Sequence, residues 1–142
     1  MTLVGRSAVN HPLKAIDVAA DDRRTPADLF ARLHAVYRFT LDVAASSENA
    51  VLPRYIAVED NALEQSWAGE RAWCNPPYSR LEPWLAKAWA EVRDRCELVA
   101  LLLPNNRCEQ PFWQKHVEPY RDGSTFHGVR CSTRFIPGRP KF

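Results

Sequence analysis

The 142-residue chain contains 46% apolar and 11% aromatic residues, a composition that predicts one folded domain and excludes a disordered chain. No segment approaches the roughly 20 apolar residues of a membrane helix, and the N-terminus lacks a signal-peptide pattern, so we expect a cytoplasmic protein. The four cysteines have no C-x-x-C pair and no nearby histidine, which predicts reduced, mostly buried thiols and no metal site.

The small net charge of +2 is unevenly distributed along the chain. Residues 121–142 carry five Lys or Arg against one acid, a local charge of +4, which leaves −2 for residues 1–120. A basic end of this kind fits contacts with nucleic-acid phosphates, but a solvated polar terminus has the same composition. The charge therefore favours a nucleic-acid partner only weakly.

The first predicted element is a helix that begins near residue 25. Residues 1–24 are polar and lack periodicity, so we expect a partly disordered leader ahead of a domain at 25–142. Thr25, Pro26 and Asp28 predict a helix start, because a hydroxyl cap, a proline at the first helical position and an acid in the first turn each favour one. An apolar face then extends the helix to about Tyr37.

Apolar runs at 39–44, 55–58, 72–74 and 98–103 predict four strands, and 128–136 resembles another. Helical patterns lie between the third and fourth runs and at 110–117. The first of these two helices starts either near a capping box at Ser79 or at Pro83, and the proline favours the later start. This order predicts an α/β fold with a mostly parallel sheet and flanking helices.

Polar residues lie at or near the ends of three of the predicted strands. In a parallel sheet, ligands bind beyond the carboxyl ends of the strands, so we expect Asp42, Asp60 and Asn75 to converge on one edge. Asp42 and Asn75 are only 33 positions apart, and one strand–helix–strand unit takes about 30 residues. The sheet must therefore be abbreviated on this side.

The stretch Asn75-Pro76-Pro77-Tyr78 lies between the strand at 72–74 and the next helix, where a catalytic loop would leave the tip of a strand. The Asn75 side-chain oxygen and the Pro76 carbonyl offer two acceptors for the N–H groups of an exocyclic amine such as that of adenine. Pro77 and Pro76 fix the backbone, and Tyr78 offers a ring for stacking on the base. The alternative is a rigid turn without a catalytic role.

A methyl sulfonium is the natural electrophile for such an amine, since in-line attack transfers the methyl group without a metal. S-adenosylmethionine then needs an acid for its ammonium group or ribose, and Asp42 and Asp60 are the candidates. Either acid has a structural alternative, such as a cap or an ion pair. A target base in a duplex would have to be flipped out, unless the substrate is single-stranded. We expect the isolated histidines His34 and His116 to be packing or surface residues, and Trp73 and Trp113 to pack in the core.

Several stretches together resemble the phage and prophage family of DNA N6-adenine methyltransferases of the Dam type. They are Thr25-Pro26-x-x-Leu29-Phe30, Leu41-Asp42-Val43-Ala44-Ala45 with Glu48-Asn49-Ala50, Glu59-Asp60-Asn61-Ala62-Leu63 leading to Trp67, Trp73-Cys74-Asn75-Pro76-Pro77-Tyr78-Ser79, and Arg134-Phe135-Ile136-x-Gly138-Arg139-x-Lys141-Phe142. The resemblance implies a Rossmann-like methyltransferase fold, S-adenosylmethionine as cofactor, adenine in DNA as acceptor and a phage or prophage source.

The resemblance also implies roles for single residues. Thr25, Pro26 and Asp42 would help to hold the cofactor, and Asn75, Pro76 and Tyr78 would form the acceptor pocket. The chain lacks a glycine-rich turn after Asp42, so the small side chains from Ala44 to Ser46 would have to admit the cofactor. It also ends where relatives continue into another apolar strand, which predicts an unsealed sheet edge and a weakened, dimeric or inactive protein.

The sequence leaves two other functions open. The same tetrapeptide serves methyltransferases that act on other planar amines or amides, such as RNA adenine or a protein glutamine. A non-catalytic nucleic-acid-binding remnant is the alternative from a different class. The target sequence cannot be read from the chain, because no separate recognition domain is visible.

Overall fold

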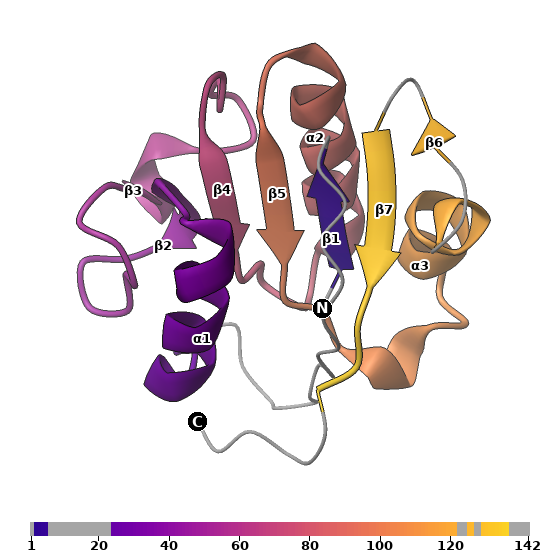
Figure 1. Ribbon diagram of the computed structural model, residues 1–142, viewed down its shortest axis with the longest axis horizontal. Coiled ribbons are helices and arrows are strands. Elements are labelled where there is room, and N and C mark those ends of the chain that lie inside the picture. The colour runs from indigo at the N-terminus through magenta and orange to yellow at the C-terminus, as the bar shows by residue number, and fades with distance from the viewer. Residues whose placement is uncertain (1, 6–23, 122–124, 127–128, 137–142) are drawn as a thin grey trace.

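The computed structural model describes residues 2–5, 24–121, 125–126 and 129–136. In these residues seven strands form one sheet in the order β3-β2-β4-β5-β1-β7-β6 (Figure 1). The strands are β1 (Thr2–Gly5), β2 (Leu41–Ala45), β3 (Tyr55–Ala57), β4 (Arg71–Cys74), β5 (Leu98–Leu101), β6 (Thr125–Phe126) and β7 (Val129–Thr133). The helices are α1 (Ala27–Tyr37), α2 (Leu81–Asp94) and α3 (Pro111–His116), with 3-10 turns η1 (Val58–Asp60), η2 (Asn105–Arg107) and η3 (Glu118–Tyr120).

Four neighbouring strands, β3, β2, β4 and β5, run parallel, whereas β1 is antiparallel to both β5 and β7. Figure 1 shows α1 in front of the sheet and α2 behind it. The structure therefore confirms the predicted α/β fold with a parallel sheet and flanking helices. None of the helices formed by the described residues is long and apolar enough to span a bilayer.

Strand β5 is apolar throughout and β4 is apolar after Arg71, because helices cover both faces of these strands. One core, the α1-side core, contains Trp73 together with α1 and alternate residues of β5. The other, the α2-side core, contains Ala72 and Cys74 together with α2 and α3. Trp73 and Trp113 are both buried, which confirms the predicted packing roles. All four cysteines are free thiols and three of them are buried, as predicted.

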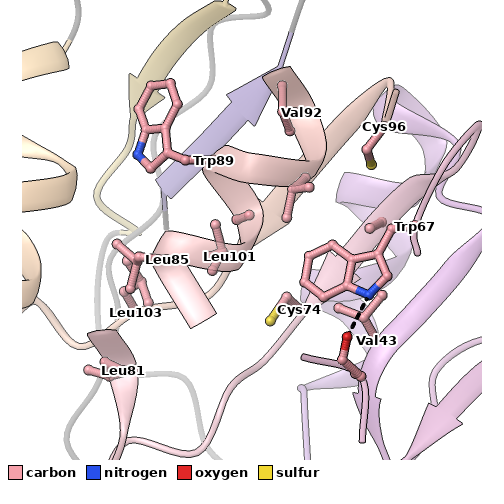
Figure 2. Close-up of a cluster of buried hydrophobic side chains, with 14 of the residues drawn as sticks. Val43, Trp67, Cys74, Leu81, Leu85, Trp89, Val92, Cys96, Leu101 and Leu103 are labelled. Carbon is pink, nitrogen blue, oxygen red and sulfur yellow. Dashed lines mark hydrogen bonds between the residues drawn. The ribbon is translucent and has the colours of Figure 1, made fainter. Parts of the chain in front are cut away.

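Trp67 anchors the segment after η1 to the α2-side core (Figure 2). Its side chain is 0% exposed, and its ring N–H donates to the Ala62 carbonyl at 3.1 Å. Its backbone N–H donates to the Glu91 carboxylate at 2.8 Å, and Glu91 also pairs with Lys87 on α2 at 2.6 Å. The segment from Ala62 to Trp67 is thereby fixed against helix α2.

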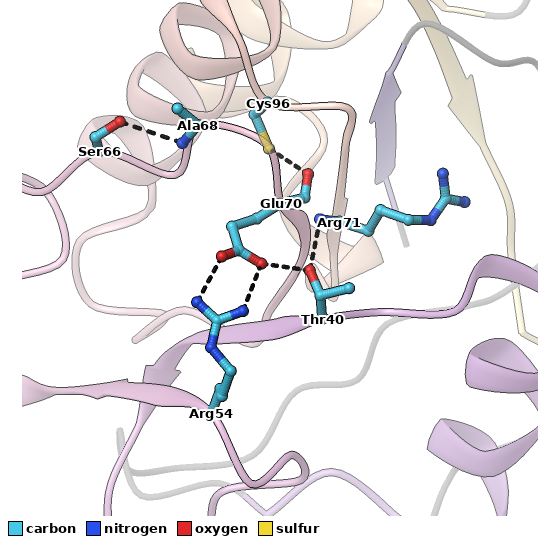
Figure 3. A network of polar contacts seen from close by, with 7 residues as sticks. All are labelled: Thr40, Arg54, Ser66, Ala68, Glu70, Arg71 and Cys96. Carbon is cyan, nitrogen blue, oxygen red and sulfur yellow. Dashed lines mark hydrogen bonds and ion pairs between the residues drawn. The ribbon is translucent and has the colours of Figure 1, made fainter.

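A polar network ties together the residues that precede β2, β3 and β4 (Figure 3). The Glu70 carboxylate accepts hydrogen bonds from both terminal nitrogens of Arg54, at 2.6 and 3.1 Å, and from the Thr40 hydroxyl at 2.5 Å. Burial by itself would raise the Glu70 pKa, but these hydrogen bonds and the Arg54 charge outweigh it and lower the pKa. The network secures the amino ends of the strands, opposite the end where ligands bind in parallel sheets.

Both predicted helix starts need correction. Helix α1 begins at Ala27 with Pro26 as its N-cap, and Thr25 does not cap it, because the first helical hydrogen bond runs from Phe30 N–H to the Pro26 carbonyl. Helix α2 begins at Leu81, and the predicted later start is wrong. A proline is tolerated at its third position because N–H groups of the first turn have no helical partner.

The sheet differs from the prediction in two places. Strand β2 continues to Ala45, so Asp42 is its second residue and does not lie at its carboxyl end. Residues 2–5, predicted as part of a disordered leader, form β1 between β5 and β7, through pairing that no local pattern reveals. The rest of the predicted leader, from 6 to 23, lies outside the described residues. The boundary at residue 25 stays a prediction.

Candidate active site at the carboxyl ends of the strands

A cavity of about 660 Å³ lies where the carboxyl ends of β2 and β4 meet the loops that follow them. Its wall combines the end of β2 and its loop, the segment around Asn61, the loop after β4 and the start of α2. Most of the lining side chains are apolar. The lining residues are Val43, Ala44, Ala45, Ser46, Glu48, Asn49, Ile56, Ala57, Asn61, Ala62, Leu63, Asn75, Pro77, Ser79, Arg80, Pro83 and Trp84.

The loop Asn75-Pro76-Pro77-Tyr78, the acceptor loop, leaves the tip of β4 as predicted. Asn75 and Pro77 line the cavity, whereas Pro76 between them is buried and does not line it. The side-chain amide nitrogen of Asn75 donates to the Thr25 hydroxyl at 3.3 Å. Asn75 is thereby joined to a residue 50 positions earlier in the chain.

Backbone carbonyls on both sides of Pro76 have fixed partners. The Cys74 carbonyl accepts the Leu102 N–H at 2.9 Å, which extends the pairing of β4 with β5. The Pro77 carbonyl accepts the Arg80 N–H at 3.2 Å. No hydrogen bond from a described residue reaches the Pro76 carbonyl. This carbonyl therefore keeps its capacity to accept an N–H from a substrate.

Tyr78 is less accessible than a stacking role requires. Its side chain is only 4% exposed and belongs to the α2-side core, and it does not line the cavity. The Tyr78 carbonyl accepts a hydrogen bond from the Arg107 guanidinium at 3.1 Å. Base stacking by Tyr78 thus stays a prediction, and it requires the ring to turn out of the core.

Asp42 is 3% exposed and closes the loop that follows β2. One carboxylate oxygen accepts the Ala44 N–H at 3.2 Å and the other accepts the Val51 N–H at 3.1 Å. Burial raises the Asp42 pKa, and these two backbone hydrogen bonds oppose the rise. Asp42 does not line the cavity, whereas Ala44 does.

The rest of this loop takes its shape from side chains that bond to its own backbone. The Asn49 side-chain oxygen accepts the Ser46 N–H at 2.7 Å, and the Ser46 hydroxyl accepts the N–H groups of Glu48 and Asn49, both at 3.3 Å. Such local bonds fix turns without glycine. Ser46, Glu48 and Asn49 all line the cavity, so this turn takes the place of a glycine-rich one.

The remaining predicted cofactor residues lie beside the cavity and do not line it. Asp60 is an exposed residue of η1, and its neighbour Asn61, with a φ of 46°, is the one on the wall. Thr25 and Pro26 are half-buried just ahead of α1. Cofactor binding by these three residues stays a prediction.

Sequence reasoning overlooked the two charged residues of the cavity wall. Among the described lining residues, Glu48 carries a negative charge and Arg80 a positive one, and both are exposed. A signal was available for each: Glu48 lies in a stretch that carries the family resemblance, and Arg80 follows the acceptor loop by two positions. Neither lies at the end of a strand, which is why the strand-based argument passed over them.

Comparison with known proteins agrees with this geometry. Residues 14–122 match the DNA N-6-adenine-methyltransferase (Dam) family. The chain belongs to this family. The match contains the acceptor loop, the turn after β2 and Thr25, and it confirms the predicted family. Dam-family enzymes use S-adenosylmethionine as methyl donor.

Two curated relatives are phage proteins named DNA N-6-adenine-methyltransferase. The one from Escherichia phage T1 is 34% identical over 92 residues, which cover 63% of this chain and 39% of the relative. The one from Haemophilus phage HP1 is 31% identical over 74 residues, which cover 52% of this chain and 43% of the relative. The aligned part is about two fifths of each of these Dam proteins. No solved structure matches the chain significantly.

Proposed function

We propose that this Dam-family chain transfers a methyl group from S-adenosylmethionine to the exocyclic amine of adenine in DNA. The observation that supports this most directly is the acceptor loop: Asn75 lines the cavity, and beside it the Pro76 carbonyl receives no hydrogen bond from the described residues. These two groups supply adjacent acceptors where the strands end.

The two acceptors act on the attacking nitrogen. The lone pair of an adenine amine is delocalised into the ring, so the nitrogen is a poor nucleophile. When the Asn75 side-chain oxygen and the Pro76 carbonyl each accept one N–H, the nitrogen becomes more tetrahedral and its lone pair is aimed away from the loop. The same oxygens stabilise the positive charge that develops on the nitrogen as the new bond forms.

The cavity fits the proposed methyl donor in size and chemistry. Bound S-adenosylmethionine supplies a methyl group on a positively charged sulfur. A volume of about 660 Å³ lies within the roughly 300–1,000 Å³ of small-ligand pockets. Small residues such as Ala44 permit close approach to the end of β2. We assign Glu48 to the cofactor ammonium group or the ribose hydroxyls, because it is the acid that lines the wall.

DNA would approach from the side of the acceptor loop. Arg80 is exposed on the cavity wall beside this loop, and we assign it to a backbone phosphate. The amine of a paired base is inaccessible inside a duplex, so the target must be flipped out or single-stranded. We also propose that the chain acts in the cytoplasm of a bacterial host. A homodimer is a further proposal, which light scattering of the purified chain tests.

The decisive experiment removes the Asn75 acceptor. The Asn75→Ala variant should transfer tritiated methyl groups to adenine-methylation-free DNA at least about 100-fold more slowly, the usual effect of removing one preorganised polar group. Cofactor affinity, measured by calorimetry, should stay within a few-fold, since the substitution removes only acceptor alignment. Arg93→Ala, at an exposed residue of α2 outside the cavity wall, is the control for a surface truncation and should keep wild-type turnover.

The same assay separates the alternatives when RNA and protein acceptors are added. Label in RNA or protein but not in DNA would assign the acceptor loop to another planar amine or amide. DNA retention without transfer at saturating cofactor would indicate a non-catalytic binding protein. Wild-type turnover by Asn75→Ala would refute the proposed mechanism.

A further inference from the structure

The acceptor loop is held by two side chains that lie far from it in the sequence. Thr25, ahead of α1, accepts a hydrogen bond from the Asn75 amide nitrogen at 3.3 Å. Arg107, in η2 after β5, donates to the Tyr78 carbonyl at 3.1 Å. One contact holds the first residue of the loop and the other holds its last.

The Thr25 contact determines the direction of the Asn75 side chain. The Thr25 hydroxyl does not cap α1. Leu29 and Phe30 in the α1-side core fix the start of helix α1 to the sheet. The position of Thr25, which directly precedes this helix, is therefore restrained as well. Because a carboxamide is planar, holding its nitrogen on one side directs its oxygen to the other.

The segment that carries Arg107 is also held in place by hydrogen bonds. The Arg107 carbonyl accepts the Gln110 N–H at 3.0 Å, and the Gln114 side chain donates to the Cys108 carbonyl at 2.8 Å. The segment that carries Arg107 is thus tied to helix α3. A guanidinium that donates to the Tyr78 carbonyl restrains the end of the loop that leads into α2.

We propose that Thr25 and Arg107 are positioning residues that hold the acceptor loop in its amine-binding geometry. This inference rests on the proposed function for its kinetic consequence, but the contacts themselves are independent of it. It gives Thr25 a role different from the cofactor binding that the family resemblance implies. A displacement of a reacting group by about 1 Å can lower the reaction rate about 100-fold. Loss of a contact that restrains this loop should therefore lower kcat.

The first test compares Thr25→Val, which removes the hydroxyl at similar size, with Thr25→Ser, which keeps it. Thr25→Val should lower kcat by about 10- to 100-fold, the range between the loss of one hydrogen bond and a displacement of about 1 Å. The dissociation constant for S-adenosylmethionine should stay within about twofold. Thr25→Ser should recover most of kcat. A raised cofactor dissociation constant with unchanged kcat would make Thr25 a cofactor ligand and overturn the proposal.

The second test uses Arg107→Met, with Arg93→Met on the exposed surface of α2 as a control. Loss of the loop restraint should lower kcat while the KM for DNA and its salt dependence stay as in the wild type and in Arg93→Met. If Arg107 contacts DNA phosphate instead, the KM for DNA rises and its salt dependence weakens, because one counterion fewer is released. That result would overturn the role of Arg107.

A spectroscopic measurement separates this inference from the proposed function. The side-chain amide signals of Asn75, assigned by their loss in Asn75→Asp, should exchange slowly with solvent in the wild type and in Thr25→Ser, and faster in Thr25→Val. If the wild type methylates no acceptor but shows this pattern, the proposed function fails and the Thr25 restraint stands. If Thr25→Val leaves the Asn75 signals unchanged, the Thr25 restraint is refuted whatever the activity.

Discussion

Replacement of Trp67 by phenylalanine tests how the segment beside the cavity is anchored. The Trp67 side chain is fully buried, and its ring N–H donates to the Ala62 carbonyl at 3.1 Å inside the core (Figure 2). Phenylalanine keeps an aromatic ring but cannot donate this hydrogen bond. The Ala62 carbonyl would then keep only its longer hydrogen bond, which it accepts from the Gln65 N–H at 3.3 Å.

Trp73 provides the matched control. It is also fully buried, but its ring N–H has no hydrogen-bond partner among the described residues. Both substitutions shrink a buried ring by the same atoms, so most of that cost cancels between them. What differs is the one hydrogen bond lost in Trp67→Phe, which contributes about 0.5–1.5 kcal/mol. Trp67→Phe should therefore lose about that much more unfolding free energy than Trp73→Phe.

Urea unfolding monitored by circular dichroism measures this difference. For a domain of this size, about 0.5–1.5 kcal/mol corresponds to a melting temperature roughly 2–5 °C lower for Trp67→Phe than for Trp73→Phe. Because Ala62 lines the cavity, Trp67→Phe should also weaken cofactor binding, whereas Trp73→Phe should not. Equal stability losses in the two variants would show that the hydrogen bond to Ala62 contributes nothing and would refute the reasoning.

Two further predictions concern the carboxylates beside the strands. Since Arg54 and Thr40 hold the Glu70 pKa below its usual 4.5, the stability that Glu70 contributes is present above pH 4.5 and is lost as the pH falls through its lowered pKa. Urea unfolding of Glu70→Gln should therefore depend less on pH between 6 and 3.5 than that of the wild type, and equal slopes would contradict this. In Asp42→Asn the amide can accept only one of the two backbone N–H groups, so amide exchange at Ala44 or Val51 should accelerate while β5 stays protected. Unchanged exchange together with weaker cofactor binding would make Asp42 a direct ligand instead.

Local chemistry in the sequence was enough to predict most of the fold. The run at 98–103 is apolar at every position, a pattern typical of a strand that is covered on both faces. The structure confirms this, because every residue of β5 is buried. The position of the acceptor loop could also be predicted from the sequence. Two consecutive prolines after a short apolar run favour a rigid turn at the end of a strand.

Tertiary structure decided the features that depend on distant partners. Strand β1 could not be predicted from a local pattern, because it pairs with β5 and β7, and its partner residues run from Leu98 to Leu101 and from Arg130 to Thr133. The sequence could not show that the Asp42 carboxylate bonds to the backbone of its own loop, and cofactor binding by Asp42 stays a prediction.

The features that the sequence predicts differ for a physical reason from those that only the tertiary structure decides. Helix and strand patterns, proline turns and family motifs depend on neighbours within a few residues, so the sequence by itself determined the α/β fold and the place of the acceptor loop at the tip of β4. Which acid lines the cavity, and which hydroxyl holds Asn75, depend on how separate segments pack together. Only the folded chain brings the Thr25 hydroxyl to within 3.3 Å of the Asn75 amide nitrogen and places Glu48, and not Asp42, on the cavity wall.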